Sequence, residues 1–238
     1  MTSLSQYYEE SLYPLQNGVL RAVENCKTRF YLTGGTALSR AYYHHRYSDD
    51  LDFFVNRDPD YNDQVDIIMS QLQKEGFFWD SNVDFVKAPD FRSLKVQWKQ
   101  SDTALKLDFV NDSVPHFGDF IVSSVFHRID PVRNILSNKL GAIFRFAGKD
   151  VADIREIALH ESIDWAEILN EARQKDAGVD FAYITEILKA IPRKEFDNIH
   201  WVNNPGWETF KKDIDDIALD MLRVTGSDET FLQMVDKT

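Results

Sequence analysis

The sequence has a single cysteine, Cys26, among 238 residues. One cysteine cannot form an intrachain disulfide, and it excludes zinc or iron–sulfur sites built from cysteine clusters. No apolar run approaches the roughly 18 residues of a membrane span. The opening residues, MTSLSQYYEE, lack the basic start and apolar core of a secretory signal. We therefore expect a soluble, cytoplasmic, globular protein without a membrane partner.

Basic charge is also scarce. The chain has 27 Lys and Arg against 39 Asp and Glu, a net charge of −12. Long-range repulsion makes such a protein a poor general binder of polyanions, so DNA is not an expected partner. Basic residues exceed acidic ones over 87–106 (5 − 2 = +3) and 128–155 (6 − 3 = +3), whereas 156–238 is acidic (9 − 18 = −9). A phosphate-bearing ligand should therefore contact the first two thirds of the chain.

Hydrophobic spacing predicts an α+β protein without internal repeats or Gly/Ser linkers. Spacing of three and four predicts helices over 4–26 and 60–75. A third helix is expected over 36–42 after the glycine turn, and Asp130-Pro131 predicts the start of a fourth that runs to about residue 146. Short apolar runs and period-two alternation predict strands over 30–32 and 51–55 and two or three antiparallel strands within 77–110. Asp130 and Asp150 are predicted helix N-caps. The remainder is helical, so we expect a mixed sheet with flanking helices in a domain 1–130 and a helical domain 131–238.

Three acidic residues fall on predicted strands. Asp50 and Asp52 are two residues apart, so their side chains should share one face while Leu51 and Phe53 enter the core. Asp108 alternates with Leu107 and Phe109 in the same way. If the two strands are neighbours, three carboxylates converge, an arrangement that repels itself unless a cation lies among them. Hard divalent cations prefer such oxygens, and two-metal phosphoryl transfer uses this donor set.

A glycine pair precedes these acids. Gly34 and Gly35 lie between a predicted strand and a predicted helix, where the backbone can approach a phosphate and direct its N–H groups at it. The Thr36 hydroxyl is placed to donate to a phosphate oxygen. Either pattern alone is more often structural: a Gly-Gly pair is usually a turn, and an Asp-x-Asp pair is usually solvated. Their order along the chain favours a nucleotide site.

The same residues carry a family resemblance. Gly-Gly-Thr-Ala-Leu over 34–38, followed by Arg46-x-Ser48-x-Asp50-Leu-Asp52-Phe, resembles the nucleotidyltransferases of the AbiEii/AbiGii toxin family, within the DNA polymerase β-like superfamily. Further similarities are Leu107-Asp108, Lys139 and the stretch from Arg145 to Asp153. The family pattern has a second arginine where this chain has Lys149, which keeps the charge but loses bidentate geometry.

The resemblance implies a polymerase β-like core followed by a helical lobe, with an NTP and two Mg²⁺ ions, or Mn²⁺ in their place, between them. By position, it makes Asp50, Asp52 and Asp108 catalytic metal ligands, with Asp108 activating the acceptor hydroxyl. It implies that Lys139 reaches the triphosphate. The remaining implied nucleotide-binding residues are Gly34, Gly35, Thr36, Arg46, Ser48, Arg145, Asp150 and Asp153. For Lys139 and Arg145, exposed helix positions are an alternative, and for Arg46 a structural ion pair with Asp49 or Asp50.

The expected function is therefore metal-dependent transfer of NMP from an NTP, ATP among the candidates, to an acceptor hydroxyl. The family analogy favours a toxin–antitoxin or phage-defence toxin that acts on tRNA 3′ ends and has a cognate antitoxin. The acidic balance keeps two alternatives open. One is transfer to a small molecule or a protein hydroxyl, and the other is a non-catalytic member that binds a nucleotide or a partner.

Overall fold

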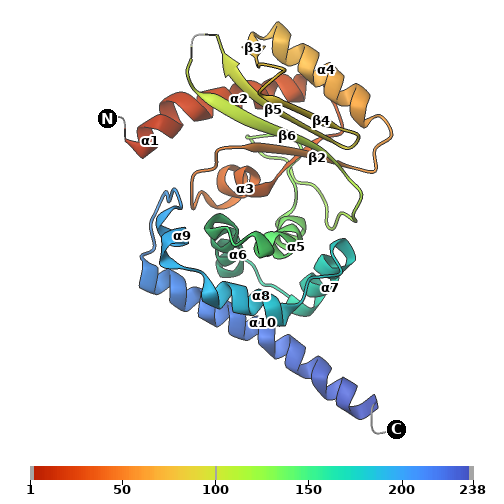
Figure 1. Ribbon diagram of the computed structural model, residues 1–238, viewed down its shortest axis with the longest axis vertical. Helices are drawn as coiled ribbons and strands as arrows, with labels where there is room; N and C mark the ends of the chain where they lie inside the picture. Colours follow the sequence, from red (N-terminus) through yellow and green to blue (C-terminus); the bar gives the residue numbers. More distant parts are fainter. Residues whose placement is uncertain (1–2, 100, 236–238) are drawn as a thin grey trace. The chain divides into compact units, whose positions relative to one another are not determined.

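The computed structural model describes residues 3–99 and 101–235, with side chains described as far as residue 224. The chain divides into two compact units, Met1–Pro131 and Val132–Thr238. All the described strands lie in the first unit, and helices make up the second (Figure 1). The predicted α+β class, a mixed sheet with helices followed by a helical region, is confirmed.

The first unit is built on a six-stranded sheet. Its strands are β1 (Tyr31–Thr33), β2 (Leu51–Asn56), β3 (Phe77–Phe78), β4 (Phe85–Ala88), β5 (Phe91–Trp98) and β6 (Ala104–Asp112). Their order is β1-β2-β6-β5-β3, and β4 also pairs with β5. The pair β2–β6 is parallel, and the other pairs are antiparallel. The antiparallel region that alternation predicted is therefore present, with β6 also joined to β2.

Alternation along the central strands separates an apolar face from a polar one. Phe53, Leu107 and Phe109 are fully buried on the first face. Helices α2 (Tyr13–Asn25) and α4 (Tyr61–Lys74) contact each other beside the sheet (Figure 1), and the Tyr61 hydroxyl donates to the Phe109 carbonyl. The alternate residues, among them Asp52 and Asp108, are only partly buried. Burial of the apolar face therefore directs these acids to the opposite face.

Two short helical segments each adjoin a π-helical turn. At the N-terminus, α1 (Leu4–Tyr7) continues through the π turn η1 (Tyr8–Leu12) into α2. After β1, α3 (Gly34–Ala37) begins at once and continues as the π turn η2 (Leu38–Tyr43). The helix predicted after the glycine pair therefore includes both glycines. π turns of this kind occur frequently at functional sites.

The elements that the structure describes in the second unit are all helical. It comprises α5 (Val132–Ala142), the 3₁₀ turn η3 (Ile143–Arg145), α6 (Gly148–His160), α7 (Trp165–Lys175), α8 (Phe181–Ala190), α9 (Arg193–Asp197) and α10 (Trp207–Val235). Helix α10 packs along α8, and α5 contacts α6 and α7. Ile154, Leu188 and Phe210 are fully buried in its core. None of the helices in the described part of the chain has the length and apolar character needed to span a bilayer.

Two predicted N-caps have other roles. Helix α6 begins at Gly148 with Ala147 as its N-cap, so Asp150 lies inside the first turn, where it is fully buried. Helix α5 begins at Val132, two residues after Asp130. The buried Asp130 carboxylate accepts a hydrogen bond from Thr33 Oγ1, and it contacts His116 Nε2 at 3.0 Å. Both aspartates have tertiary partners that a local capping pattern cannot reveal.

Candidate active site

The structure brings two of the predicted acids together on neighbouring strands. Asp52 lies on β2 and Asp108 on β6, and the two are register partners in the parallel pair. Hydrogen-bonded neighbouring strands lie about 4.8 Å apart, so both carboxylates start from adjacent backbone positions on one face. Asp50 directly precedes β2, two residues before Asp52. The neighbouring strands on which the predicted convergence depended are therefore present.

Gly34 lies against Asp52. It follows β1 directly, and its φ of +71° is in the region that favours glycine. A Cβ at this position would lie 2.5 Å from Asp52 Oδ2. The carboxylate therefore occupies the space that a side chain would fill, and the glycine backbone and an acidic group adjoin. A phosphate bound by the Gly34 backbone would lie next to the Asp52 carboxylate, a side chain that can bind a metal ion.

Gly35 is packed by the two residues that the motif places before the acid pair. A Cβ on Gly35 would lie 2.3 Å from Arg46 Nη2 and 3.1 Å from Ser48 Oγ. Arg46 is buried, and its Nη1 donates to the Tyr47 carbonyl at 3.0 Å. Arg46 and Ser48 therefore pack against the glycine turn and fill the space that a side chain at Gly35 would need.

Thr36 has a partner other than the one expected. Its side chain is fully buried, and Oγ1 donates to the Asp50 carbonyl. The predicted donation of this hydroxyl to a phosphate oxygen stays a prediction. Thr36 links the start of α3 to the residue that precedes β2.

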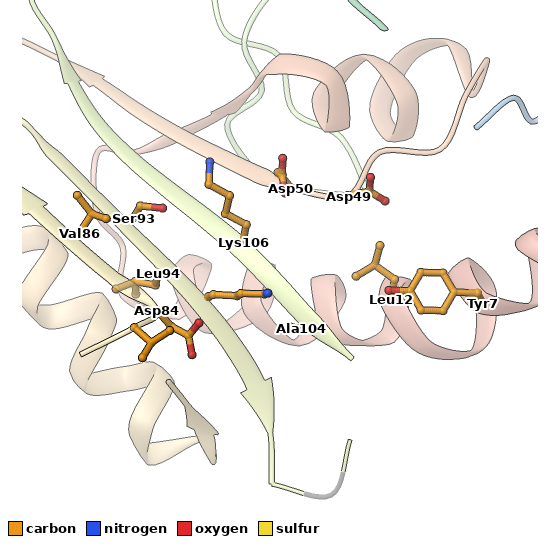
Figure 2. Close-up of a pocket in the computed structure, with 12 residues that line it drawn as sticks. Tyr7, Leu12, Asp49, Asp50, Asp84, Val86, Ser93, Leu94, Ala104 and Lys106 are labelled. Carbon is orange, nitrogen blue, oxygen red and sulfur yellow. The ribbon is translucent and has the colours of Figure 1, made fainter. Parts of the chain in front are cut away.

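Lys106 and Ser93 belong to the site, and neither was predicted as a site residue. Lys106 Nζ lies 2.5 Å from Asp108 Oδ2, and Ser93 Oγ donates to Asp108 Oδ1 at 2.6 Å. Lys106 is two residues from Asp108 on the same strand, so alternation alone could have predicted that both side chains share a face. Ser93 lies opposite Asp108 through the β5–β6 register, which the sequence does not reveal. Figure 2 shows Lys106, Ser93 and Asp50 lining one cavity of about 410 Å³.

The charges of Asp50, Asp52 and Asp108 all act on the Lys106 ammonium group. Partial burial lowers the pKa of its ammonium, but the hydrogen bond and charge of Asp108, with the charges of Asp50 and Asp52, outweigh burial and raise that pKa. Among the described residues, no three His, Cys, Asp or Glu side chains are grouped closely enough to hold a metal ion as they stand. Mg²⁺, however, commonly uses one or two carboxylates together with substrate phosphates. Asp52, beside the Gly34 backbone, and Asp50, two residues before it, fit that donor set.

The N-terminal helical run supports the acid pair from outside the motif. Gln16 on α2 is fully buried, and its Nε2 donates to the Ser48 carbonyl at 2.9 Å. The Tyr8 hydroxyl donates to Asp49 Oδ1 at 2.5 Å, and the Tyr8 ring stacks on Tyr47. Asp49 is therefore hydrogen-bonded to the N-terminal helical run. Burial, followed by the Asp49 hydrogen bond, raises the pKa of Tyr8.

The predicted residues of the second unit form a cluster of their own. Lys139 Nζ lies 2.7 Å from Asp150 and 2.6 Å from Asp153, and both carboxylates are fully buried. Arg145 also contacts Asp150, at 2.9 Å, while 60% of its side chain remains exposed. Lys139 is therefore a buried ion-pair residue, which excludes the exposed-helix alternative. Arg145 is the accessible cation of this cluster.

Trp201 and Trp207 pack around Phe196 and Phe210.

Comparison with known proteins identifies the family. The model of the nucleotidyl transferase AbiEii toxin family, a type IV toxin–antitoxin system, matches residues 19–236. The chain belongs to this family. It is therefore a toxin nucleotidyltransferase, and its family implies an NTP substrate and a cognate antitoxin. None of the curated proteins matches the chain.

Solved structures share the fold of this AbiEii-family chain at low sequence identity. JHP933 from Helicobacter pylori is 18% identical with a TM-score of 0.62, covering 94% of this chain and 97% of its own. A second H. pylori protein is 19% identical with a TM-score of 0.58, covering 90% and 96%. The nucleotidyltransferase toxin MenT4 from Mycobacterium tuberculosis is 13% identical with a TM-score of 0.52, covering 95% and 90%. Each resembles the chain over nearly its whole length.

Proposed function

We propose that this AbiEii-family chain transfers NMP from an NTP to an acceptor hydroxyl in a reaction that depends on divalent metal, with tRNA 3′ ends as acceptor. The observation that carries the proposal is the position of Asp52. Its carboxylate lies against the Gly34 backbone and starts from the β2 position that pairs with Asp108 on β6. The Gly34 backbone proposed to bind phosphate, the proposed metal ligand Asp52 and the proposed base Asp108 are therefore neighbours within the first unit.

In the proposed reaction, Asp108 and the glycine turn have different roles. The acceptor oxygen forms a bond to the α-phosphorus, and the bond from the α-phosphorus to the bridging oxygen breaks, so that pyrophosphate leaves. Asp108 accepts the proton of the acceptor hydroxyl. The N–H groups of Gly34 and Gly35 bind phosphate oxygens, and Arg46 and Ser48 keep that turn in place.

Asp50 and Asp52 would hold the divalent cation, with Asp108 as a third ligand for a pair of Mg²⁺ or Mn²⁺ ions. When bound, such ions lower the pKa of a coordinated hydroxyl and neutralise charge that develops on the phosphates. Within the second unit, we propose that Arg145 contacts the nucleotide. Asp150 holds Arg145 in place, and the buried Lys139, which pairs with both Asp150 and Asp153, fixes Asp150.

The tRNA acceptor is the part of the proposal that the negative charge of the chain opposes most. The exposed lysines of the β4–β5 region, Lys87, Lys95 and Lys99, can contact an RNA backbone, whereas Arg92 is buried. Arg133 is paired with Glu167 and Glu171. Fewer basic side chains are therefore available than the sequence predicted. Transfer to a small molecule or to a protein hydroxyl remains the second candidate.

A labelling experiment tests the proposal. The protein is incubated with Mg²⁺, each α-labelled NTP in turn, and total RNA, a small-molecule extract or total protein, with Asp52→Asn as control. We expect label in the tRNA fraction from at least one NTP, and none with Asp52→Asn. Label in protein or small molecules alone would change the acceptor, and no Asp52-dependent label in any fraction would favour a non-catalytic role.

A further inference from the structure

Lys106 is bound to the acid that the proposed reaction needs as a base. Its Nζ lies 2.5 Å from Asp108 Oδ2, and Ser93 Oγ lies 2.6 Å from Oδ1. Each oxygen of the Asp108 carboxylate therefore already has a donor. A carboxylate that is paired with an ammonium group is a weaker base and a weaker metal ligand than a free one.

The positive charge of Lys106 also acts on the acids near Asp108. Lys106 lines one cavity with Asp50, and its partner Asp108 is the register neighbour of Asp52, so the ammonium group lies near all three acids. In the described part of the chain, no group of three acidic or other metal-ligating side chains is close enough to hold an ion as it stands. Through its ion pair with Asp108, the Lys106 ammonium group thus offsets part of the negative charge of the triad.

We propose that Lys106 is a positioning residue that acts as the resident counter-cation of the Asp50–Asp52–Asp108 triad and leaves Asp108 when a divalent cation binds. This inference rests on the proposed function, because it requires metal binding at these acids. It adds a competition: the ammonium and the divalent ion neutralise the same negative charge. Lys106 therefore weakens metal binding in the absence of nucleotide and keeps the free protein stable.

The side chain has room for this movement. About half of it, 48%, is exposed, while Asp108 is only 15% exposed. Lys106 also lines the cavity of about 410 Å³ beside Asp50 (Figure 2). Its four-carbon stem can turn into this cavity without disturbing the buried residues Leu105 and Leu107 on either side. A rearrangement of one side chain is therefore sufficient.

The cross-strand neighbour of Lys106 provides a matched control. Lys95 on β5 is the register partner of Lys106 on β6, is exposed, and lines the same cavity. Lys106→Met and Lys95→Met each remove one positive charge from the cavity and keep an unbranched side chain. Only Lys106→Met removes the Asp108 ion pair.

The experiment measures Mn²⁺ binding by calorimetry, without nucleotide, for wild type, both Met variants, Lys106→Arg and Asp52→Asn. Thermal melting is followed with and without Mn²⁺. We expect Lys106→Met to bind Mn²⁺ about tenfold more tightly than wild type, since a unit charge a few Å from a divalent ion costs about this much even at the dielectric constant of water. The variant should melt at a lower temperature without metal and recover with it. Lys95→Met and Lys106→Arg should stay near wild type.

Three results have distinct meanings. If binding requires Asp52 and Lys106→Met leaves the affinity unchanged or weaker, the inference is wrong and the proposed function stands. A gain of equal size in Lys95→Met would also overturn it, because general cavity charge would then explain the effect. If neither wild type nor Lys106→Met shows binding that requires Asp52, the metal dependence of the proposed function fails together with the inference.

Discussion

Asp52 lies next to both neighbouring strands and the glycine turn. It pairs in register with Thr33 on β1 and Asp108 on β6, and its carboxylate lies against Gly34. We predict that Asp52→Asn lowers transfer at least about 100-fold, the scale on which a preorganised electrostatic group acts. The amide has the shape of the carboxylate, so the melting temperature should change by only a few degrees. Label incorporation and thermal melting measure the two effects.

Asp112 offers the matched control for this substitution. It lies at the end of β6, has the same strand parity as Asp108, and pairs in register with Asn56. Asp112→Asn should retain wild-type transfer. Equal losses in both variants would show that general acidity of this face, and not the position of Asp52, supports the reaction.

Lys139 belongs to a second prediction at this scale. Its ammonium neutralises Asp150 and Asp153, which are fully buried. Lys139→Met leaves both carboxylates without this partner, and we expect a loss of about 3 kcal/mol or more in the free energy of unfolding. Urea denaturation measures it. Combining Lys139→Met with Asp153→Asn should recover part of the loss, whereas a single variant as stable as wild type would contradict the buried pairing.

At the scale of the element, the turn from β1 into α3 can be tested with two glycines that both have a positive φ. Gly34 has φ +71° and Gly76 has φ +88°. An added Cβ would lie 2.5 Å from Asp52 Oδ2 at Gly34, but it would meet nothing within 4 Å at Gly76. Alanine should cost about 1–2 kcal/mol of backbone strain at either position. Only Gly34→Ala should also lose NTP binding, which calorimetry measures.

The segment after β2 carries a pH-dependent contribution to stability. The Arg29 hydrogen bonds, with help from Gln64 and the Asp60 N–H, lower the pKa of Asp58 to about 2 despite its burial. An unfolded aspartate titrates near 3.9. The contribution is therefore complete above the unfolded pKa and is lost as pH falls from about 4 to about 2. Asp58→Asn should lower the urea midpoint near pH 6 and have a smaller effect near pH 2.5. Equal effects at both pH values would contradict this linkage.

The same element scale shows what the sequence could predict. The strand 51–55 and the glycine pair were predictable because alternation and φ-permissive residues are local signals. The contacts of Asp108 were not, because Ser93 reaches it through the β5–β6 register and Lys106 through a side-chain conformation. Asp150 has a partner outside its own segment, Lys139, so the local capping rule assigned it the wrong contact. The hydrogen bond from Thr36 to the Asp50 carbonyl is a tertiary contact that the glycine-turn pattern did not reveal.

At the scale of the whole molecule, the net charge of −12 makes the acceptor a question of salt dependence. If tRNA is the acceptor, log affinity should fall with log salt by about 0.9 per duplex phosphate contact or about 0.7 per single-strand contact. Lys87→Glu with Lys99→Glu should weaken tRNA labelling and spare NTP binding. Lys212→Glu, at an exposed position in the acidic second unit, is the control. Flat salt dependence with active NTP turnover would favour a small-molecule or protein acceptor.

The central claim is that this AbiEii-family chain transfers the α-phosphate portion of an NTP through the site at Asp52. The most direct measurement supplies the same NTP labelled at either the α- or the γ-phosphate, with Mg²⁺ and total tRNA, and follows pyrophosphate release in wild type and Asp52→Asn. We predict that only the α-label enters RNA, with one pyrophosphate released per label, and that Asp52→Asn does neither. Incorporation of the γ-label, or pyrophosphate release that continues in Asp52→Asn, would contradict the account.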